Sequence, residues 1–192
     1  MSRDRYRQIT QYIRYSSHSI TSDNKGNKYK DFLFKIILNS NKLYKPSNQK
    51  SIDESMVKFE GRVQNVVYMR DKPIKKWFKM YVLCDSMNGF CINIFPHIGK
   101  SQFPVKKVIN FFAKNLNKND FLYMDRYYCT VDIFLNLKKL DIRAIVTIMQ
   151  NRKNLSKQYL SNINLQRYES TIFTYDNSIK ILIWKDKKMY IQ

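Results

Sequence analysis

The sequence predicts a mixed α/β protein in which helices pack on a sheet. From about residue 50 onward, short β-prone apolar runs alternate with amphipathic stretches, and turn sequences separate them. Their order is strand, hairpin strands, helix, strand, helix, strand, which is typical of a mixed sheet with flanking helices. A hydrophobic fraction of 44% indicates a folded chain rather than a disordered one.

Two helical segments are predicted before the sheet. The first begins after Ser2, a plausible N-cap, because apolar residues recur at helical spacing: Tyr6, Ile9 and Ile13. Residues 16–30 are polar and loop-like. A second, short helix is predicted over residues 32–38, and the Lys-Pro-Ser sequence around Pro46 ends it.

An antiparallel hairpin is predicted next, formed by strands at 77–84 and 90–95. The residues between them, Asp-Ser-Met-Asn-Gly, are a turn sequence in which Asp85 needs no role beyond the turn. Residues 104–116 then predict an amphipathic helix with Pro104 in its first turn. Its apolar face would consist of Val105, Val108, Ile109, Phe112 and Leu116.

The remaining elements complete the α/β pattern. A buried-type strand over 121–124 precedes a helix over 131–140 that Thr130 can cap, and 142–148 predicts another strand. Residues 170–192 predict a separate small β hairpin element with its turn at Asp176-Asn177. We therefore divide the chain into a helical segment (1–48), an α/β core (49–155) and the start of a β-rich unit (156–192).

The charge is strongly basic. Lys and Arg number 35 against 15 acids, which gives a net charge of +20 and a pI near 9.9. A coding bias toward AT-rich codons could explain the many lysines, but it should also enrich Asp and Glu, which are scarce. The excess of basic residues therefore favours a surface that binds a polyanion, usually nucleic acid. A membrane surface is the weaker alternative. No apolar run approaches the roughly 20 residues that span a bilayer, so no transmembrane segment is expected, and nucleic acid rather than a membrane is the expected partner.

The cysteines and histidines predict no zinc site. Three cysteines and two histidines lack the usual ligand spacing: Cys84, Cys91, Cys129, His18 and His97. The cysteines fit reduced thiols in apolar strands, which favours an intracellular protein.

Two carboxylates stand out by their positions. Asp53 lies at the predicted entry to the sheet, and Asp125 ends the apolar run 121–124. If the two strands are neighbours, the carboxylates could share a divalent ion such as Mg²⁺ or Mn²⁺, and phosphoryl transfer is the reaction that such ions support. From position alone, a cap or turn role is the more frequent explanation of an acid at a strand end.

Several blocks in register resemble the signature of piggyBac transposases and their domesticated derivatives. A tyrosine-proline-serine stretch precedes a SIDE-M-xxFxGR block, and further blocks follow as far as a W-x-D-x-R-like segment. The matching blocks are YKPS (44–47), SIDESMV (51–57), FEGR (59–62), DKPIKKWFK (71–79), LCDS (83–86), YMDRYY (123–128), NRK (151–153) and IWKDKK (183–188). MSRDRY (1–6) resembles a motif that the family carries well inside its transposase domain, so residues 1–48 would belong to its DNA-binding and dimerisation region.

The resemblance implies a ribonuclease-H-like, retroviral-integrase-type fold and a metal-dependent cut-and-paste DNA transposase. By resemblance, Asp53 and Asp125 match the first and second catalytic aspartates and would bind Mg²⁺ or Mn²⁺. The expected partner is double-stranded DNA (transposon ends and TTAA targets), in the nucleus, with the chain forming a homodimer or a dimer with a full-length relative. The candidate nucleic-acid contacts are Arg62, Lys75, Lys76, Arg126, Arg152 and Lys153.

The sequence also departs from the family pattern. The family's third aspartate lies in a later glycine-rich block, whereas this sequence has four glycines and no Gly-Gly, and it lacks the family's cysteine-rich zinc module. Arg126 stands where the family usually has Asn. None of the acidic residues after Asp125 lies in a glycine-rich block of that kind: Asp132, Asp141, Glu169, Asp176 and Asp186. These departures argue against autonomous transposition and leave three readings open, namely a degenerate DNA-binding transposase, a domesticated regulatory module and a relic.

Overall fold

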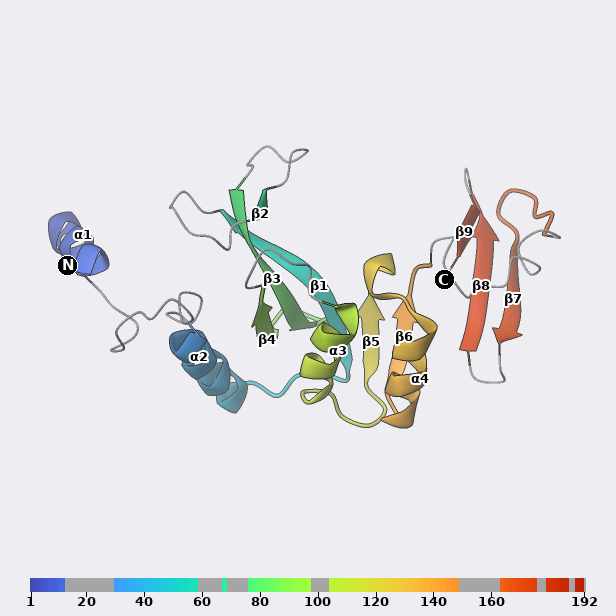
Figure 1. The fold of residues 1–192 in the computed structure, drawn as a ribbon, viewed down its shortest axis with the longest axis horizontal. Helices are drawn as coiled ribbons and strands as arrows, with labels where there is room; N and C mark the ends of the chain where they lie inside the picture. The colour runs from blue at the N-terminus through green and yellow to red at the C-terminus, as the bar shows by residue number, and fades with distance from the viewer. Residues whose placement is uncertain are drawn as a thin grey trace.

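A mixed sheet forms the centre of the computed structural model (Figure 1). The structure describes residues 1–12, 30–58, 67–68, 76–97, 104–148, 163–175, 179–186 and 189–191. The strands of this sheet are β1 (Gln49–Lys58), β2 (Val67–Tyr68), β3 (Lys76–Asp85), β4 (Cys91–Pro96), β5 (Phe121–Met124) and β6 (Arg143–Val146). All the core strands that the sequence predicts are present, and the two-residue strand β2 was not predicted.

Strand β1 lies at the middle of this sheet. It pairs antiparallel with β3 along nearly its whole length and parallel with β5, which in turn pairs parallel with β6. The other edge of β3 pairs with β2 and β4. The β3–β4 connection is the predicted hairpin, and Gly89 adopts a φ of 75° in its turn, a conformation that glycine tolerates best.

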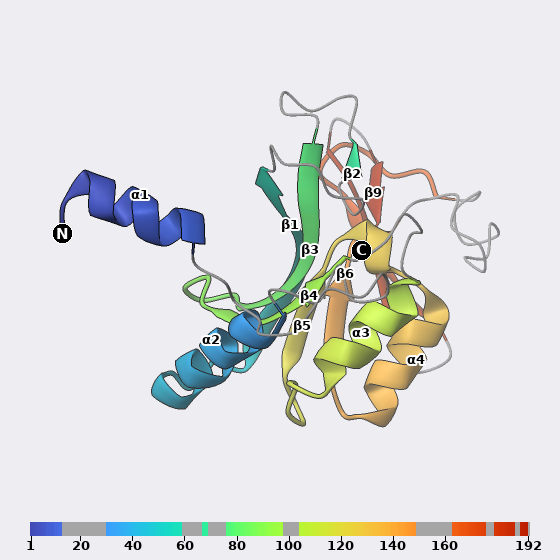
Figure 2. The same cartoon turned by 60° about the vertical axis from the view of Figure 1, so that its left-hand side comes forward.

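Helices α3 (Val105–Ala113) and α4 (Val131–Lys139) lie side by side over one face of the sheet (Figure 2). The predicted apolar face of α3 is buried in the core through Val108, Ile109 and Phe112. Thr130 caps α4 as predicted, because its side-chain oxygen accepts a hydrogen bond from the Ile133 amide. The helices therefore bury the face of the sheet that carries Ile52, Tyr81, Leu83, Leu122 and Met124.

The two N-terminal helices are α1 (Arg3–Tyr12) and α2 (Lys30–Leu43). Helix α1 begins after Ser2 as predicted and buries no residue. Helix α2 is longer than predicted at both ends. Its polar C-terminal turn is held by the sheet, since Asn41 Nδ2 donates a 2.8 Å hydrogen bond to the Ile92 carbonyl of β4. This contact joins distant parts of the chain, so the local helix propensity did not predict the longer helix.

A second, three-stranded antiparallel sheet follows, composed of β7 (Ser170–Tyr175), β8 (Ile179–Lys185) and β9 (Met189–Ile191). Strands β7 and β8 form the predicted hairpin, whose turn at 176–178 lies outside the described residues, and β9 adds a third strand. Ile181 and Ile183 are buried in its small core. Among the described residues, no helix combines the length and apolar character needed to cross a bilayer.

One cysteine departs from its predicted setting. Cys84 and Cys91 lie in strands, as expected, but Cys129 follows the short 3-10 helix η2 (Arg126–Tyr128). It is buried as a member of the core cluster. The prediction that all three thiols lie in strands was therefore wrong for Cys129.

Candidate functional site

The register between β1 and β5 brings Asp53 and Asp125 to the same edge of the sheet. The two strands run parallel from the Gln49–Phe121 pair to the Ile52–Met124 pair. One further step places Asp53 level with Asp125, which keeps an extended backbone at φ −77° and ψ 162°. Paired strands lie about 4.8 Å apart, so the register places the two aspartates on neighbouring strands although they are far apart in the sequence.

Both aspartates point away from the helices. Side chains alternate along a strand, and the neighbours Ile52 and Met124 are buried on the face that α3 and α4 cover. Asp53 and Asp125 therefore lie on the opposite face, and both are exposed. Cys84 pairs with Ser51, two residues before Asp53, so its side chain lies on the same face as Asp53. Burial raises the pKa of the Cys84 thiol, and the charge of Asp53 raises it further.

Each carboxylate is oriented by the amide that follows it. Oδ1 of Asp53 accepts a 2.7 Å hydrogen bond from the Glu54 amide, and Oδ1 of Asp125 accepts one of 2.6 Å from the Arg126 amide. Asp125 thereby caps η2. Within the described part of the chain, no hydrogen bond is made to either Oδ2 atom.

The predicted position of Asp53 needs a correction. Asp53 is the fifth residue of a ten-residue strand rather than the entry to the sheet. Strand β1 continues to Lys58 because β3 pairs with it beyond the point at which β5 ends. The edge on which Asp53 lies is thus created by the short neighbour β5, which the sequence around Asp53 does not reveal.

The donor set suits one hard divalent cation. Mg²⁺ is commonly bound by one or two carboxylates, with water and phosphate oxygens completing its shell. Across the ranges that the structure describes, no group of three or more His, Cys, Asp or Glu side chains could hold a metal ion. Asp53 and Asp125 supply two carboxylates of the kind that Mg²⁺ uses.

A charged and aromatic cluster lies on the face of the sheet that α3 and α4 cover, opposite the face of Asp53 and Asp125. Lys79 Nζ forms a 3.1 Å ion pair with Glu54 and lies over the rings of Tyr81 and Tyr127, at 5.0 and 5.3 Å from their centroids. These contacts join β1 and β3 to η2, the segment that begins directly after Asp125. Sequence reasoning missed this cluster, although Lys79 belongs to the DKPIKKWFK block.

Two buried tyrosines complete the cluster. Tyr81 and Tyr128 are 1% and 0% exposed, and their rings meet edge to face. Burial is the main cause that raises the pKa of both phenols above the ordinary value. Tyr127 raises the pKa of Tyr81 further, and Glu54 raises that of Tyr128. Both phenols therefore stay protonated at physiological pH, and their rings pack in the core.

Asp85 has a larger role than the predicted turn. It is fully buried, and its carboxylate accepts hydrogen bonds from the Tyr44 hydroxyl (2.9 Å), the Ser47 amide (2.8 Å), the Ser47 hydroxyl (2.7 Å) and the Met87 amide (2.9 Å). The predicted turn role is confirmed by the hydrogen bond from the Met87 amide, which lies within the turn. The contacts to Tyr44 and Ser47 join the YKPS block to the LCDS block, and only the tertiary structure shows them.

A buried ion pair was also not predicted from the sequence. The Lys50 ammonium is bonded to the Asp120 carboxylate, and the two side chains are 2% and 4% exposed. Asp120 also accepts a 2.6 Å hydrogen bond from the Asn117 amide. This pair fixes the start of β1 against the start of β5, and so supports the register on which the Asp53–Asp125 arrangement depends.

The predicted nucleic-acid contacts are only partly described. Arg126 is exposed and directly follows Asp125. The backbone of Lys76 begins β3, opposite Tyr68. The other candidates lie outside the described residues: Arg62, Lys75, Arg152 and Lys153.

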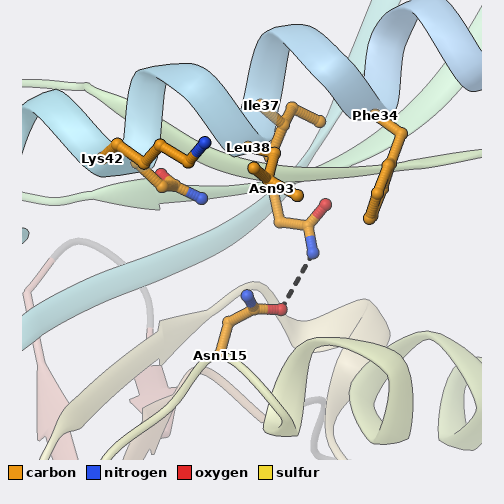
Figure 3. A pocket seen from close by; sticks show the side chains of 7 residues that line it. Phe34, Ile37, Leu38, Lys42, Asn93 and Asn115 are labelled. Atoms are coloured by element: carbon orange, nitrogen blue, oxygen red, sulfur yellow. Dashed lines mark hydrogen bonds between the residues drawn. The ribbon is translucent and has the colours of Figure 1, made fainter.

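A pocket of about 290 Å³ lies between α2, β4 and the end of α3 (Figure 3). Asn93 Nδ2 donates a 2.8 Å hydrogen bond to Asn115 Oδ1 at one wall, and Phe34 and Leu38 project from α2. Lys42 is the charged residue that lines it. The pocket includes none of the residues predicted for the functional site.

Comparisons with known proteins bear on the family and the fold of the chain. A family model described as Transposase IS4 matches residues 1–191. The cryo-EM structure of a piggyBac transposase synaptic complex with hairpin DNA aligns with the whole chain at a TM-score of 0.83 and 21% identity, and the chain spans 43% of that transposase. A Mos1 transposase paired-end complex aligns with 73% of this chain and 49% of its own at 9% identity and a TM-score of 0.35, which is too low to support an inference.

Proposed function

The chain belongs to the IS4 transposase family, and we propose that it is a piggyBac-type, transposase-derived protein that binds double-stranded DNA and carries part of a metal-dependent phosphoryl-transfer site. Its fold is the ribonuclease-H-like fold that the motif resemblance predicted. The observation that carries the proposal is the parallel register of β1 and β5, which aligns Asp53 with Asp125 on the face opposite the helices.

Charge supports the DNA-binding part of the proposal. A net charge of +20 attracts a polyanion over distances set by the salt concentration, and displaced counterions then contribute to binding. Arg126 is exposed beside the carboxylates, where it would contact a phosphate placed at Asp53 and Asp125. Transposon ends and TTAA targets are the DNA that the motif resemblance suggests, and a nuclear location and a dimer belong to the same proposal.

Asp53 and Asp125 would hold the divalent ion. When bound, such an ion stabilises the charge that develops on phosphate oxygens during hydrolysis or strand transfer. The chain's own contribution is orientation: the Glu54 and Arg126 amides fix one oxygen of each carboxylate, and both aspartates are exposed. Arg126 would neutralise part of the charge of an incoming phosphate.

Two carboxylates are fewer than the family pattern implies for DNA cleavage. No third carboxylate joins the pair among the described residues. We therefore propose that the 192 residues bind DNA and one divalent ion without efficient cleavage, because two-ion catalysis requires ligands for both the attacking and the leaving oxygen.

The test combines Mn²⁺ binding with plasmid nicking. Mn²⁺ binding, followed by electron paramagnetic resonance, should decrease strongly in the Asp53→Asn and Asp125→Asn proteins and persist in Asp132→Asn, which changes an exposed acid on α4. Unchanged Mn²⁺ binding in the first two variants would overturn the metal site. Efficient Mn²⁺-dependent nicking by the wild type that either variant abolishes would overturn the proposed incompleteness instead.

A further inference from the structure

Cys84 of β3 and Cys91 of β4 lie directly opposite each other across the hairpin. The Asp85 amide donates a 2.9 Å hydrogen bond to the Phe90 carbonyl, so the adjacent Cys84–Cys91 pair occupies a non-hydrogen-bonded position. The Cα atoms of such pairs are about 4.5 Å apart, within the range that a disulfide bridges. The ladder is irregular between Leu83 and Cys84, and the two thiols lie close enough for each to alter the pKa of the other. The hairpin therefore makes Cys84 and Cys91 neighbours across its two strands.

The surroundings of the pair leave it accessible to a small reagent. Both cysteines are half-buried, and the helices cover the opposite face of the sheet. Cys84 faces Ser51 of β1, and the Cys91 thiol makes a weak 3.9 Å contact with the Asn93 carbonyl. Asp53 is the neighbouring charge that acts on Cys84.

We propose that Cys84 and Cys91 form a redox modification site, in which a low-molecular-weight disulfide such as oxidised glutathione converts the two thiols into a cross-strand disulfide. One thiolate attacks a sulfur of the reagent, forms a mixed disulfide and releases one glutathione thiol. The other thiolate then attacks the cysteine sulfur of that mixed disulfide and releases the second glutathione. The protein loses two electrons and two protons, and the reagent gains them.

The ionisation of the thiols controls the rate. Burial raises the pKa of both thiols above the ordinary value, to about 11 at Cys91, where Cys84 adds to the rise. The thiolate is the reactive form, so the rate should increase by about tenfold per pH unit between pH 7 and 9. The product would link β3 and β4 on the same sheet face as Asp53.

The chain contains its own control. Cys129 is 5% exposed, is buried in the core cluster after η2 and belongs to neither strand. It should remain a thiol in the folded protein while Cys84 and Cys91 react. A Cys129→Ser variant should therefore form the disulfide as the wild type does, whereas Cys91→Ser should stop at a glutathione adduct on Cys84.

The experiment treats the reduced full chain with oxidised glutathione, alkylates remaining thiols after acid quench and maps the peptides by mass spectrometry. The expected result is a Cys84–Cys91 cross-linked peptide with the mass of two hydrogen atoms lost, reversed by dithiothreitol, and a melting temperature several degrees higher. A stable glutathione adduct in the wild type, a cross-link that includes Cys129, or full alkylation of both cysteines at pH 9 would overturn the proposal.

Discussion

The Tyr44 hydroxyl donates a 2.9 Å hydrogen bond to Oδ2 of Asp85, a residue 41 positions later in the chain. Ser47 contacts the same carboxylate with both its amide and its hydroxyl. Asp85 lies at the end of β3, and Tyr44 follows α2, so the buried carboxylate fastens the segment before β1 to the turn of the β3–β4 hairpin. This contact fastens the segment that leads into β1, the strand that carries Asp53.

The first prediction concerns Asp85→Ala. Its loss leaves the buried donors of Tyr44, Ser47 and Met87 without their acceptor, so the free energy of unfolding should decrease by about 3 kcal/mol. Denaturant unfolding followed by circular dichroism would measure it. Asp132→Ala is the matched control, because that exposed carboxylate makes no comparable set of hydrogen bonds in the described structure, and it should change stability far less.

The pH dependence of stability should depend on the same carboxylate. Burial alone would raise the pKa of Asp85, but the hydrogen bonds from Ser47, Met87 and Tyr44 outweigh it and lower the pKa well below the ordinary value. The stabilisation is therefore present above the unfolded-state pKa of about 4 and is lost as the pH falls below it. Melting temperatures between pH 7 and 3 should fall more steeply in the wild type than in Asp85→Asn; equal slopes would contradict the prediction.

The buried ion pair makes a third prediction. Lys50→Met leaves the Asp120 carboxylate buried without its cation, which should cost about 3–5 kcal/mol. The double variant Lys50→Met with Asp120→Asn removes both charges and should recover a large part of that loss. A double-mutant cycle from urea unfolding measures the coupling. Additive effects of the two single changes would show that the pair contributes no interaction energy.

The fourth prediction tests DNA binding at Arg126. The affinity of the wild type for duplex DNA should fall linearly with log salt, and Arg126→Ala should reduce the magnitude of that slope by about 1 if its guanidinium neutralises one phosphate. Lys118→Ala is the control, because Lys118 is 80% exposed but precedes β5, at the opposite end of that strand from Asp125. Fluorescence anisotropy over a salt series gives both slopes, and equal slopes for the wild type and the Arg126 variant would count against this contact.

The local elements were predictable because their signals lie close together in the chain. Helical spacing located α3, the hydroxyl of Thr130 located the cap of α4, and the apolar run 121–124 gave the bounds of β5 as observed. Helix α2 was the exception. Its last turn is polar, and it is stabilised by the hydrogen bond from Asn41 to the β4 backbone, which no local pattern encodes.

The candidate site was predictable only in its residues. The motif blocks singled out Asp53 and Asp125, whereas their alignment depends on the parallel register of β1 and β5. The polar contacts that hold this arrangement were not predicted: the Lys50–Asp120 pair, the Lys79–Glu54 pair and the bonds to Asp85. Each joins residues that are distant along the chain.

The sequence by itself determined the α/β element order, the basic character and the two aspartates, because periodicity, composition and motif wording are properties of neighbouring residues. The tertiary structure decided which strands are adjacent, and therefore that Asp53 and Asp125 share one face and that Cys84 meets Cys91. The physical reason is that strand pairing and the burial of charge are satisfied between distant segments. Their partners become known only when the chain has folded.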